Sequence, residues 1–266
     1  MSAVWKRLAT TAVLLPLVVW LVLGGPPWLF HALVIALSGA AVWELGRMLE
    51  RTGGASAGWL GVALGVLVTG SFAIDGAPVA ALALAVVVTM TAPLASRRAL
   101  ATDVTVTRLF GVAYVSWLLG HGILLRELPG GGELVLFLAG VTWVGESSAY
   151  AVGSMIGRHK LAPVVSPGKT VEGGIAQVLA SVLGSLLLGF WLVPGWSARR
   201  VVAAGVLLGV VGQIGDLAES VVKRSVGAKD TGGLIPGHGG VLDRLDGLLF
   251  NTPAFFYFVT FQGAVP

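Results

Sequence analysis

The sequence contains no cysteine and little charge, since only 11% of its residues are Asp, Glu, Lys or Arg. Without cysteine the chain can form neither disulfide bonds nor thiolate metal sites. Any metal ion would need oxygen or histidine ligands, and four histidines against 13 acidic residues favour carboxylates. The chain is instead 56% hydrophobic with a mean hydropathy of +0.89. This composition excludes an ordinary soluble domain and indicates a membrane protein.

The net charge of +4 gives no support for nucleic-acid binding. In a membrane protein, an excess of Lys and Arg is more typical of cytoplasmic loops. The sequence contains none of the recognised nucleic-acid-binding motifs. We therefore expect no nucleic-acid partner.

Long apolar segments make up most of the chain. A membrane-spanning helix needs about 20 mainly apolar residues, and Gly or Pro clusters and charges divide the sequence into roughly nine such segments. They are Leu8–Leu23, Trp28–Met48, Gly58–Ile74, Pro78–Leu94, Val106–Leu125, Leu134–Ile156, Val171–Val193, Val201–Val222 and Leu245–Phe261. We predict an all-α, polytopic integral membrane protein.

The distribution of basic residues predicts the topology. The first segment follows Lys6 and Arg7 and resembles a signal peptide, but no A-x-A site follows, so we interpret it as a retained anchor. Alternating the segments from a cytoplasmic N-terminus leaves only Arg126, Arg199 and Arg200 of the 17 basic residues outside. The positive-inside rule therefore predicts an N-in, C-out protein of the cell membrane, with its motif-rich loops and active site facing the cytoplasm.

The two halves of the chain differ in where their polar residues lie. In residues 1–130 the acids lie mostly near the ends of apolar segments, which predicts a scaffold that gives lipids access. Glu44 is the exception, and because Arg47 is within one turn, a local ion pair is the favoured interpretation. Residues 131–266 carry polar residues inside the segments, and we predict that they form the catalytic region.

The sixth segment carries a polar stripe. Glu146, Tyr150, Ser154 and Arg158 recur every four residues and so share one helix face, with Ser147 beside them. An acid in mid-span usually faces a bundle interior or an aqueous cavity. We expect a cavity here, with a helix–helix hydrogen bond of Glu146 as the alternative.

The next segment reads SPGKTVEG, from Ser166 to Gly173. Gly-Lys-Thr resembles the end of a P-loop, but Pro163 stands where a P-loop needs its first glycine, and we expect no strand before it. Ser166, Lys169 and Thr170 instead place donors at the start of a helix, where anions bind well. The alternative is a helix start with Thr170 as N-cap, and both interpretations can hold together.

The eighth segment becomes polar towards its end. Asp216, Glu219 or Ser220, and Lys223 share one helix face, and Arg224 follows. One central acid costs roughly 2.5 to 3.5 kcal/mol on membrane insertion, which the preceding apolar residues can offset. We expect Asp216 to face a polar cavity, whereas for Glu219 and Lys223 a pair within the helix is an equal alternative.

The loop Gly227–Gly240 is rich in glycine and holds Lys229 and His238, so its amides can approach a polyphosphate closely. Asp243 and Asp246 follow on one face of the first turn of the ninth helix, where helix capping is the alternative for one of them. For His238, which lacks histidine or cysteine neighbours, we favour a phosphate contact or a loop-structural role over metal ligation.

These motifs resemble those of the phosphatidate cytidylyltransferase (CDP-diacylglycerol synthase) family. The family pattern S-x-x-K-R, four residues, K-D, then P-x-H-G-G-x-x-D-R-x-D is matched between Ser220 and Asp246 by SVVKRSVGAKDTGGLIPGHGGVLDRLD. GESSAY, GRHKLAP and SPGKTVEG are similar to the family's D-S-x-A-Y, G-K-H-K-L-A-P and S-P-x-K-T-x-E-G. The chain departs at Glu146, where the family usually has Asp, which leaves a direct role for this carboxylate open.

The resemblance implies that CTP and phosphatidate react to give CDP-diacylglycerol and pyrophosphate, in phospholipid biosynthesis. It implies an Mg²⁺-dependent nucleotidyltransferase in the lipid bilayer, with Mn²⁺ able to substitute; a second cation and a homodimer are left open. The implied metal ligands are Asp216, Asp243 and Asp246. The implied catalytic set adds Lys223, Arg224, Lys229 and Arg244. The implied nucleotide and phosphate contacts are Ser166, Lys169, Thr170, Lys223, Arg224, Lys229, His238, Gly239 and Gly240.

Other classes of function fit the sequence less well. A transporter or channel would place charges along a path and often contain an internal repeat, whereas here the charges gather at one end of the segments. A CDP-alcohol phosphotransferase needs D-x-x-D-G-x-x-A-R, which begins at Asp243 but fails at Phe250 and Asn251. A purely structural membrane protein would leave the costly polar residues unexplained.

Overall fold

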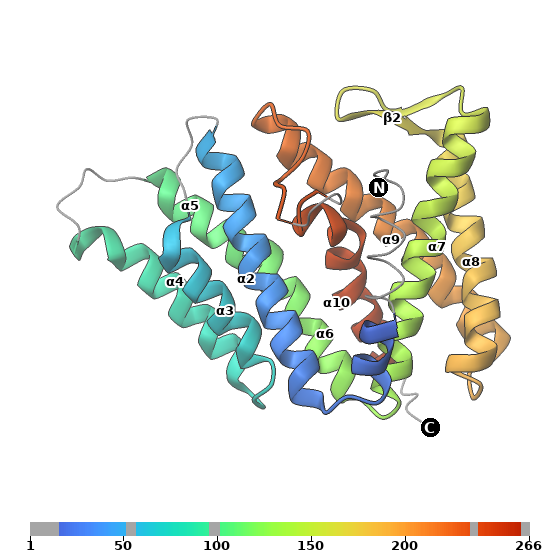
Figure 1. Cartoon of the computed structure of the whole chain (residues 1–266), viewed down its shortest axis with the longest axis horizontal. Helices are drawn as coiled ribbons and strands as arrows, with labels where there is room; N and C mark the ends of the chain where they lie inside the picture. The colour runs from blue at the N-terminus through green and yellow to red at the C-terminus, as the bar shows by residue number, and fades with distance from the viewer. Residues whose placement is uncertain (1–15, 52–56, 96–101, 235–238, 262–266) are drawn as a thin grey trace, which may run out of the picture. The chain divides into compact units, whose positions relative to one another are not determined.

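The computed structural model of the chain (Figure 1) is almost entirely helical and describes residues 16–51, 57–95, 102–234 and 239–261. The chain forms two compact units. The first comprises Met1–Leu124 and Val226–Leu245, and the second comprises Leu125–Ser225 and Asp246–Pro266. The first unit thus contains most of the long sequence motif as well as the N-terminal helices. The assignment of a scaffold to residues 1–130 and of catalysis to 131–266 stays a prediction.

The first unit is an antiparallel arrangement of apolar helices. Residues 16–23 are helical. The elements that follow are α2 (Pro27–Arg51), α3 (Gly58–Ser71), α4 (Ala77–Ala95), α5 (Thr102–Gly111), the π-helical turn η1 (Val112–Trp117), α6 (Leu118–Glu127) and the short 3₁₀ helix η2 (Leu242–Arg244). Figure 1 shows α2, α3 and α4 as neighbouring helices.

A buried chain of hydroxyl groups links three of these elements. Thr69 Oγ1 of α3 donates to Ser38 Oγ of α2 (2.7 Å), which donates to Ser116 Oγ of η1 (2.9 Å). All three side chains are fully buried. Hydroxyl hydrogen bonds of this kind add directional contacts between apolar helices, which hydrophobic burial alone does not provide inside a bilayer.

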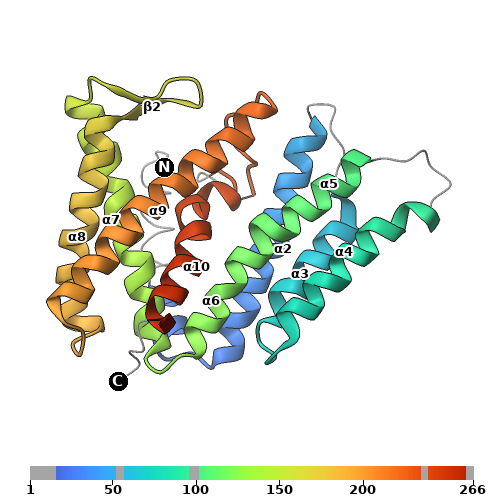
Figure 2. The same cartoon turned by 180° about the vertical axis from the view of Figure 1, so that it is seen from behind.

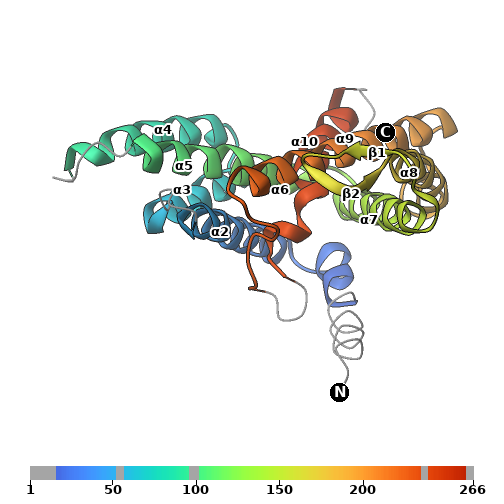
Figure 3. The same ribbon diagram turned by 90° about the horizontal axis from the view of Figure 1, so that it is seen from above.

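The second unit packs four helices with one β-hairpin. Its elements are α7 (Gly131–Ile156), β1 (Lys160–Ala162), β2 (Ser166–Thr170), α8 (Val171–Leu192), α9 (Ala198–Ser225) and α10 (Asp246–Phe261). Figure 2 shows α7, α8 and α9 from behind, and Figure 3 shows the hairpin over one end of α7 and α8. An apolar core that includes Phe137, Val141, Leu208 and Phe255 fills the inside of this unit.

Close helix packing in this unit depends on small residues of α9. A Cβ added at Gly205 would lie 2.7 Å from Val182 Cα, and one added at Gly209 would lie 2.9 Å from Val178 Cα, both in α8. Larger side chains would force the two helices apart. This is the role that small residues commonly have between membrane helices.

Six helical stretches in the described part of the chain are long and apolar enough to cross a membrane: Pro27–Glu50, Ala77–Leu94, Asp103–Glu127, Gly131–Ile156, Val171–Leu192 and Ala198–Ser225. The chain is therefore an all-α membrane protein. Two other expected spans form shorter helices, α3 with 14 residues and α10 with 16. At about 1.5 Å per residue, each is shorter than a bilayer core of about 30 Å. Of the first expected span, residues 8–15 lie outside the described residues.

The segment between α7 and α8 contains a β-hairpin that we did not expect. We expected no strand before the Lys169 motif, but Lys160 pairs with Thr170 and Ala162 with Ser166 in an antiparallel hairpin. The hairpin is too short for its alternation to stand out in the sequence. It does not restore a P-loop, because Pro163 still occupies the position of the first glycine.

Candidate active site

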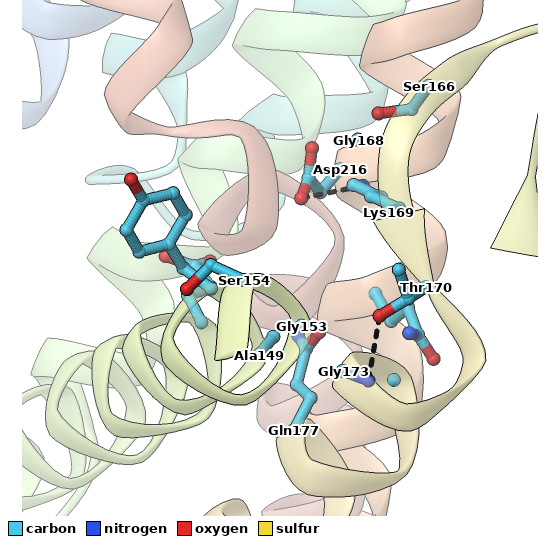
Figure 4. Close-up of a pocket in the computed structure, with 14 residues that line it drawn as sticks. Ala149, Gly153, Ser154, Ser166, Gly168, Lys169, Thr170, Gly173, Gln177 and Asp216 are labelled. Carbon is cyan, nitrogen blue, oxygen red and sulfur yellow. Dashed lines mark hydrogen bonds and ion pairs between the residues drawn. The ribbon is translucent and has the colours of Figure 1, made fainter. Parts of the chain in front are cut away.

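A polar cavity of about 330 Å³ lies in the second unit, between α7, β2, α8 and α9 (Figure 4). Its lining contains Glu146, Ala149, Tyr150, Gly153, Ser154, Ser166, Gly168, Lys169, Thr170, Gly173, Gly174, Gln177, Gln213 and Asp216. The expected cavity beside the sixth apolar segment is thus present. It contains residues from three separate motifs of the sequence.

Strand β2 brings a lysine to an acid of α9. Lys169 Nζ lies 2.6 Å from Asp216 Oδ2, and their side chains are 22% and 29% exposed (Figure 4). Thr170 ends the strand and caps α8, because Gly173 N–H donates to Thr170 Oγ1 (3.1 Å). The predicted N-cap is therefore confirmed. The cap fixes the point where the chain turns from strand to helix, and so holds Lys169 next to the helix N-terminus.

The polar end of α9 carries a second ion pair. Lys223 Nζ lies 3.1 Å from Glu219 Oε1, one turn apart, and the Glu219 side chain is only 1% exposed. The pairing of these two residues within one helix, which the sequence left open, is thus present. It still leaves Lys223 near the other charges of the unit, because Asp246 interacts electrostatically with Asp216, Lys223 and Lys169.

Three of the four residues of the predicted stripe face the cavity, whereas Arg158 lies beyond the end of α7 and does not line it. Glu146, Tyr150 and Ser154 all line the cavity. Ser147 is exposed and does not line it. The Glu146 carboxylate also packs so closely on Gly247 of α10 that a Cβ there would overlap Glu146 Oε1. Because Gly247 follows Asp246, Glu146 lies beside the first turn of α10.

The hairpin is fixed to the helices at both of its ends. Glu172 in the first turn of α8 accepts hydrogen bonds from Arg158 N–H (3.1 Å) and His159 N–H (3.3 Å), and its Oε1 lies 2.6 Å from His159 Nδ1. At the turn, Arg224 Nε donates to Val165 O (3.2 Å). Arg224 thus makes a structural contact with the Val165 carbonyl that we did not predict from the sequence.

Sequence reasoning missed three residues around this cavity. Glu172 was part of a quoted motif but received no role, although an acid in the first turn of a helix is a known stabilising feature. Gln177 and Gln213 line the cavity. Each is a polar amide in an otherwise apolar stretch, and this is the signal that could have identified them.

The long motif continues in the first unit, where Asp243 organises its loop. Both Asp243 oxygens lie near Thr231 N–H (3.2 and 3.1 Å), and Oδ2 also accepts from Gly240 N–H (3.2 Å). Gly239 has a φ of +88°, which favours glycine. Lys229 and Arg244 are exposed. The remaining predicted residue of this loop, His238, lies outside the described residues.

The contacts of Glu44 in α2 differ from the local ion pair with Arg47 that we expected. Its carboxylate accepts hydrogen bonds from Leu234 N–H (3.3 Å) and Leu242 N–H (3.0 Å) of the same loop. The Arg47 guanidinium instead lies 5.6 Å from the centre of the Trp43 ring. Proximity in sequence suggested Arg47, but a backbone segment almost 200 residues later supplies the hydrogen bonds.

The charges of the second unit suit a divalent cation bound together with phosphate. Among the described residues, no three acidic or histidine side chains gather as a metal-binding group. Asp216 and Asp246 nevertheless interact electrostatically across the cluster that holds Lys169 and Lys223. Mg²⁺ is commonly held by one or two carboxylates, with phosphate oxygens and water as its other ligands. Two acids with two lysines fit that pattern.

The fold and the cavity define a class of protein: an all-α membrane protein with a lysine–carboxylate pair in a cavity lined by polar residues. The chain belongs to the Cytidylyltransferase family, whose family model matches residues 5–262. The match covers both structural units.

The sequences of curated relatives match about half of the chain. "Uncharacterized protein YnbB" of Escherichia coli (strain K12) is 41% identical over 152 residues, which is 57% of this chain and 50% of that protein. A "Phosphatidate cytidylyltransferase" of Staphylococcus epidermidis is 37% identical over 145 residues, 54% of this chain and 55% of that protein. Another, of Brucella abortus, is 44% identical over 142 residues, 53% of this chain and 52% of that protein. The chain thus spans about half the length of the curated relatives that it matches.

Proposed function

We propose that the protein is a phosphatidate cytidylyltransferase, which converts CTP and phosphatidate into CDP-diacylglycerol and pyrophosphate. The observation that carries the proposal is the cavity in which Lys169 meets Asp216 at 2.6 Å, inside a member of the Cytidylyltransferase family. Two of the relatives described above bear the name of this activity. A membrane-embedded catalyst suits a substrate whose acyl chains stay in the bilayer.

The proposed reaction joins two anions. A phosphate oxygen of phosphatidate attacks the α-phosphorus of CTP, the new O–P bond forms, and the bond to the β-phosphate oxygen breaks so that pyrophosphate leaves. Because the attacking oxygen is already anionic, the protein needs no strong general base. It needs fixed positive charge where negative charge accumulates. Lys169 supplies such charge in the cavity, with Ser166 and Thr170 as further polar contacts, and Lys223 interacts electrostatically with Asp246.

We propose Mg²⁺ as the cofactor, with Mn²⁺ able to substitute. Asp216 and Asp246 of the second unit would hold it, whereas Asp243, which belongs to the first unit, stays a ligand predicted from the sequence motif alone. When bound, the ion would neutralise phosphate charge and orient the phosphates for in-line displacement. The carboxylate pair near two lysines supports this assignment. The motif also predicts a set of phosphate contacts, which stay predictions: Arg224, Lys229, His238, Gly239, Gly240 and Arg244.

We propose that the protein lies in the cell membrane with roughly nine spans, an N-in, C-out topology and a cytoplasmic active site. The support is the charge distribution, since alternation leaves only Arg126, Arg199 and Arg200 outside. A cytoplasmic site gives access to CTP. The phosphatidate would enter between helices with its acyl chains in the bilayer.

The test is to incubate the purified protein with phosphatidate, Mg²⁺ and CTP labelled at the α-phosphate. We expect a labelled CDP-lipid that requires both the divalent cation and phosphatidate, with one pyrophosphate released for each lipid formed. Transfer of the γ-phosphate of CTP to the lipid would instead identify a lipid kinase and overturn the proposal. Omission of phosphatidate is the control for CTP hydrolysis.

A further inference from the structure

Glu44 is a buried acid that the proposed reaction does not use. Its side chain is 1% exposed and lies in α2, about two turns before the end of this helix, which is long enough to cross the membrane. A buried carboxylate in such a helix is costly unless it is hydrogen-bonded, and it usually marks a function. Its surroundings therefore need an explanation.

Each oxygen of Glu44 holds a different part of the long sequence motif. Oε1 accepts from Leu234 N–H (3.3 Å), and Oε2 accepts from Leu242 N–H (3.0 Å). These two amides lie on either side of residues 235–238. One carboxylate thus ties together the two arms of the loop from within the same structural unit.

Two glycines of the loop allow this close approach. A Cβ added at Gly232 would lie 2.5 Å from Glu44 Oε1, and one added at Gly240 would lie 2.8 Å from Glu44 Oε2. A side chain at either position would force the Glu44 carboxylate to shift, and at Gly240 it would also displace Thr231 Oγ1 and Asp243 Oδ2. The approach of Glu44 is therefore one physical reason for glycine at these two positions of the motif.

The contacts lead from Glu44 to Asp243. Leu242, which Glu44 binds, directly precedes Asp243 in the chain. Asp243 in turn accepts from Thr231 N–H and Gly240 N–H, on the two arms that Glu44 joins. Carboxylate ligands of metals are commonly oriented by such outer hydrogen bonds, and removing one costs about 10- to 100-fold in metal affinity or activity.

We propose that Glu44 is a positioning residue that fixes the loop of residues 231–234 and 239–245 and thereby orients Asp243 for divalent-cation and phosphate binding. This inference rests on the proposed function. Both Glu44 oxygens are committed to backbone amides, so the residue acts through Asp243 and not on the substrate.

The test compares Glu44→Gln with Glu44→Asp and the control Glu50→Gln. In Glu44→Gln the side-chain amide would present one acceptor and one donor to two N–H groups, so one hydrogen bond is lost while size is kept. We expect Glu44→Gln to raise the Mg²⁺ concentration for half-maximal CDP-lipid formation about tenfold, with kcat at saturating Mg²⁺ less affected. Glu44→Asp keeps the charge and should recover part of the loss. Glu50 is exposed on the same helix, and Glu50→Gln should behave as wild type.

A second readout needs no catalysis. Hydrogen exchange of the Leu234 and Leu242 amides, measured without Mg²⁺, should become at least about tenfold faster in Glu44→Gln while the amides of α3 keep their wild-type rates. Gly232→Ala, which presses on the carboxylate from the loop side, should give the same local change. It replaces Glu44→Gln if that variant does not accumulate as folded protein.

The outcomes separate this inference from the proposed function. Wild-type exchange and Mg²⁺ dependence in Glu44→Gln or Gly232→Ala would overturn the positioning role. Faster exchange throughout the first unit, with unchanged Mg²⁺ dependence, would also overturn it, because that result describes general destabilisation. If the wild-type protein formed no CDP-lipid, the proposed function would fail, while the exchange of the two amides would still decide whether Glu44 holds the loop.

Discussion

In the second unit, nearby lysines compensate the negative charges of the acidic residues only in part. Lys169 and Asp216 form a partly exposed pair, while Glu219 is fully buried and pairs with Lys223. Asp246 adds a further acid within range of Asp216 and both lysines. Removing one member of a buried pair is costly because it leaves the other charge uncompensated. Substitutions here should therefore keep side-chain size and alter charge alone.

Asp216→Asn tests whether this acid is a metal ligand. An amide oxygen carries no net charge and binds Mg²⁺ more weakly, so we expect the apparent Mg²⁺ affinity to fall at least about tenfold while the protein still folds. The measurement is a Mg²⁺ titration of CDP-lipid formation, with thermal unfolding as the check on folding. Lys223→Met is the comparison, because it keeps the side-chain length, removes the charge and should weaken CTP binding without the same shift in Mg²⁺ dependence. If Asp216→Asn and Asp243→Asn both kept wild-type turnover at limiting Mg²⁺, the ligands would have to be sought among Asp246, Glu219 and Glu146.

At the scale of single residues, sequence spacing correctly predicted contacts between residues that are close together in the chain. The pair Glu219–Lys223 and the Thr170 cap both join residues within one helical turn, where spacing alone brings the groups together. The same logic failed for Glu44, because its partners are backbone amides far along the chain. Any residue can supply a backbone amide, so no residue type in the sequence marked those partners.

Among the elements, the β-hairpin does most to position the candidate site. Its second strand carries Ser166 and Lys169 to the cavity and ends at the cap of α8. Glu172 and Arg224 attach the hairpin to α8 and α9 through hydrogen bonds to its backbone. The position of Lys169 therefore depends on contacts several residues away from it.

Glu172→Ala should loosen the hairpin without removing a residue that lines the cavity. The variant loses the acceptor for Arg158 N–H and His159 N–H, so we expect faster amide exchange at these two positions. Because Lys169 would be less well ordered, KM for CTP should rise about tenfold, as for the loss of one charge-assisted hydrogen bond. Kinetics and hydrogen exchange provide the measurement, with Glu133→Gln in the first turn of α7 as the control. Unchanged KM together with faster exchange would show that the hairpin does not position Lys169 for CTP.

The helices were more predictable than their ends and the hairpin. Long apolar segments predicted every described helix of the bundle, since period and length are strong signals. The length of α3 was overestimated, because apolar residues continue beyond its last helical turn, whereas α10 begins one residue later than expected and ends at Phe261 as expected. The hairpin has only three residues in β1, too few to show an alternating pattern.

At the scale of the whole molecule, the distribution of basic residues predicts which loops face the cytoplasm. The hairpin of the second unit and the loop Val226–Leu245 of the first unit both carry basic residues that the positive-inside rule places in the cytoplasm. Some of these same residues are predicted to bind phosphate. An independent measurement of topology is therefore needed, since CTP can reach the site only from the cytoplasm.

The absence of cysteine from the chain allows such a measurement with single introduced cysteines. We expect Lys160→Cys and Gly233→Cys to resist a membrane-impermeant maleimide in intact cells and to react after the membrane is opened, whereas a cysteine added after Pro266 should react in intact cells. Gly233 suits the test because a side chain added there meets no atom within 4 Å. A mixture of topologies would give partial labelling of all three positions in intact cells. Full labelling of the first two from outside would reverse the predicted orientation and leave the proposed site without access to CTP.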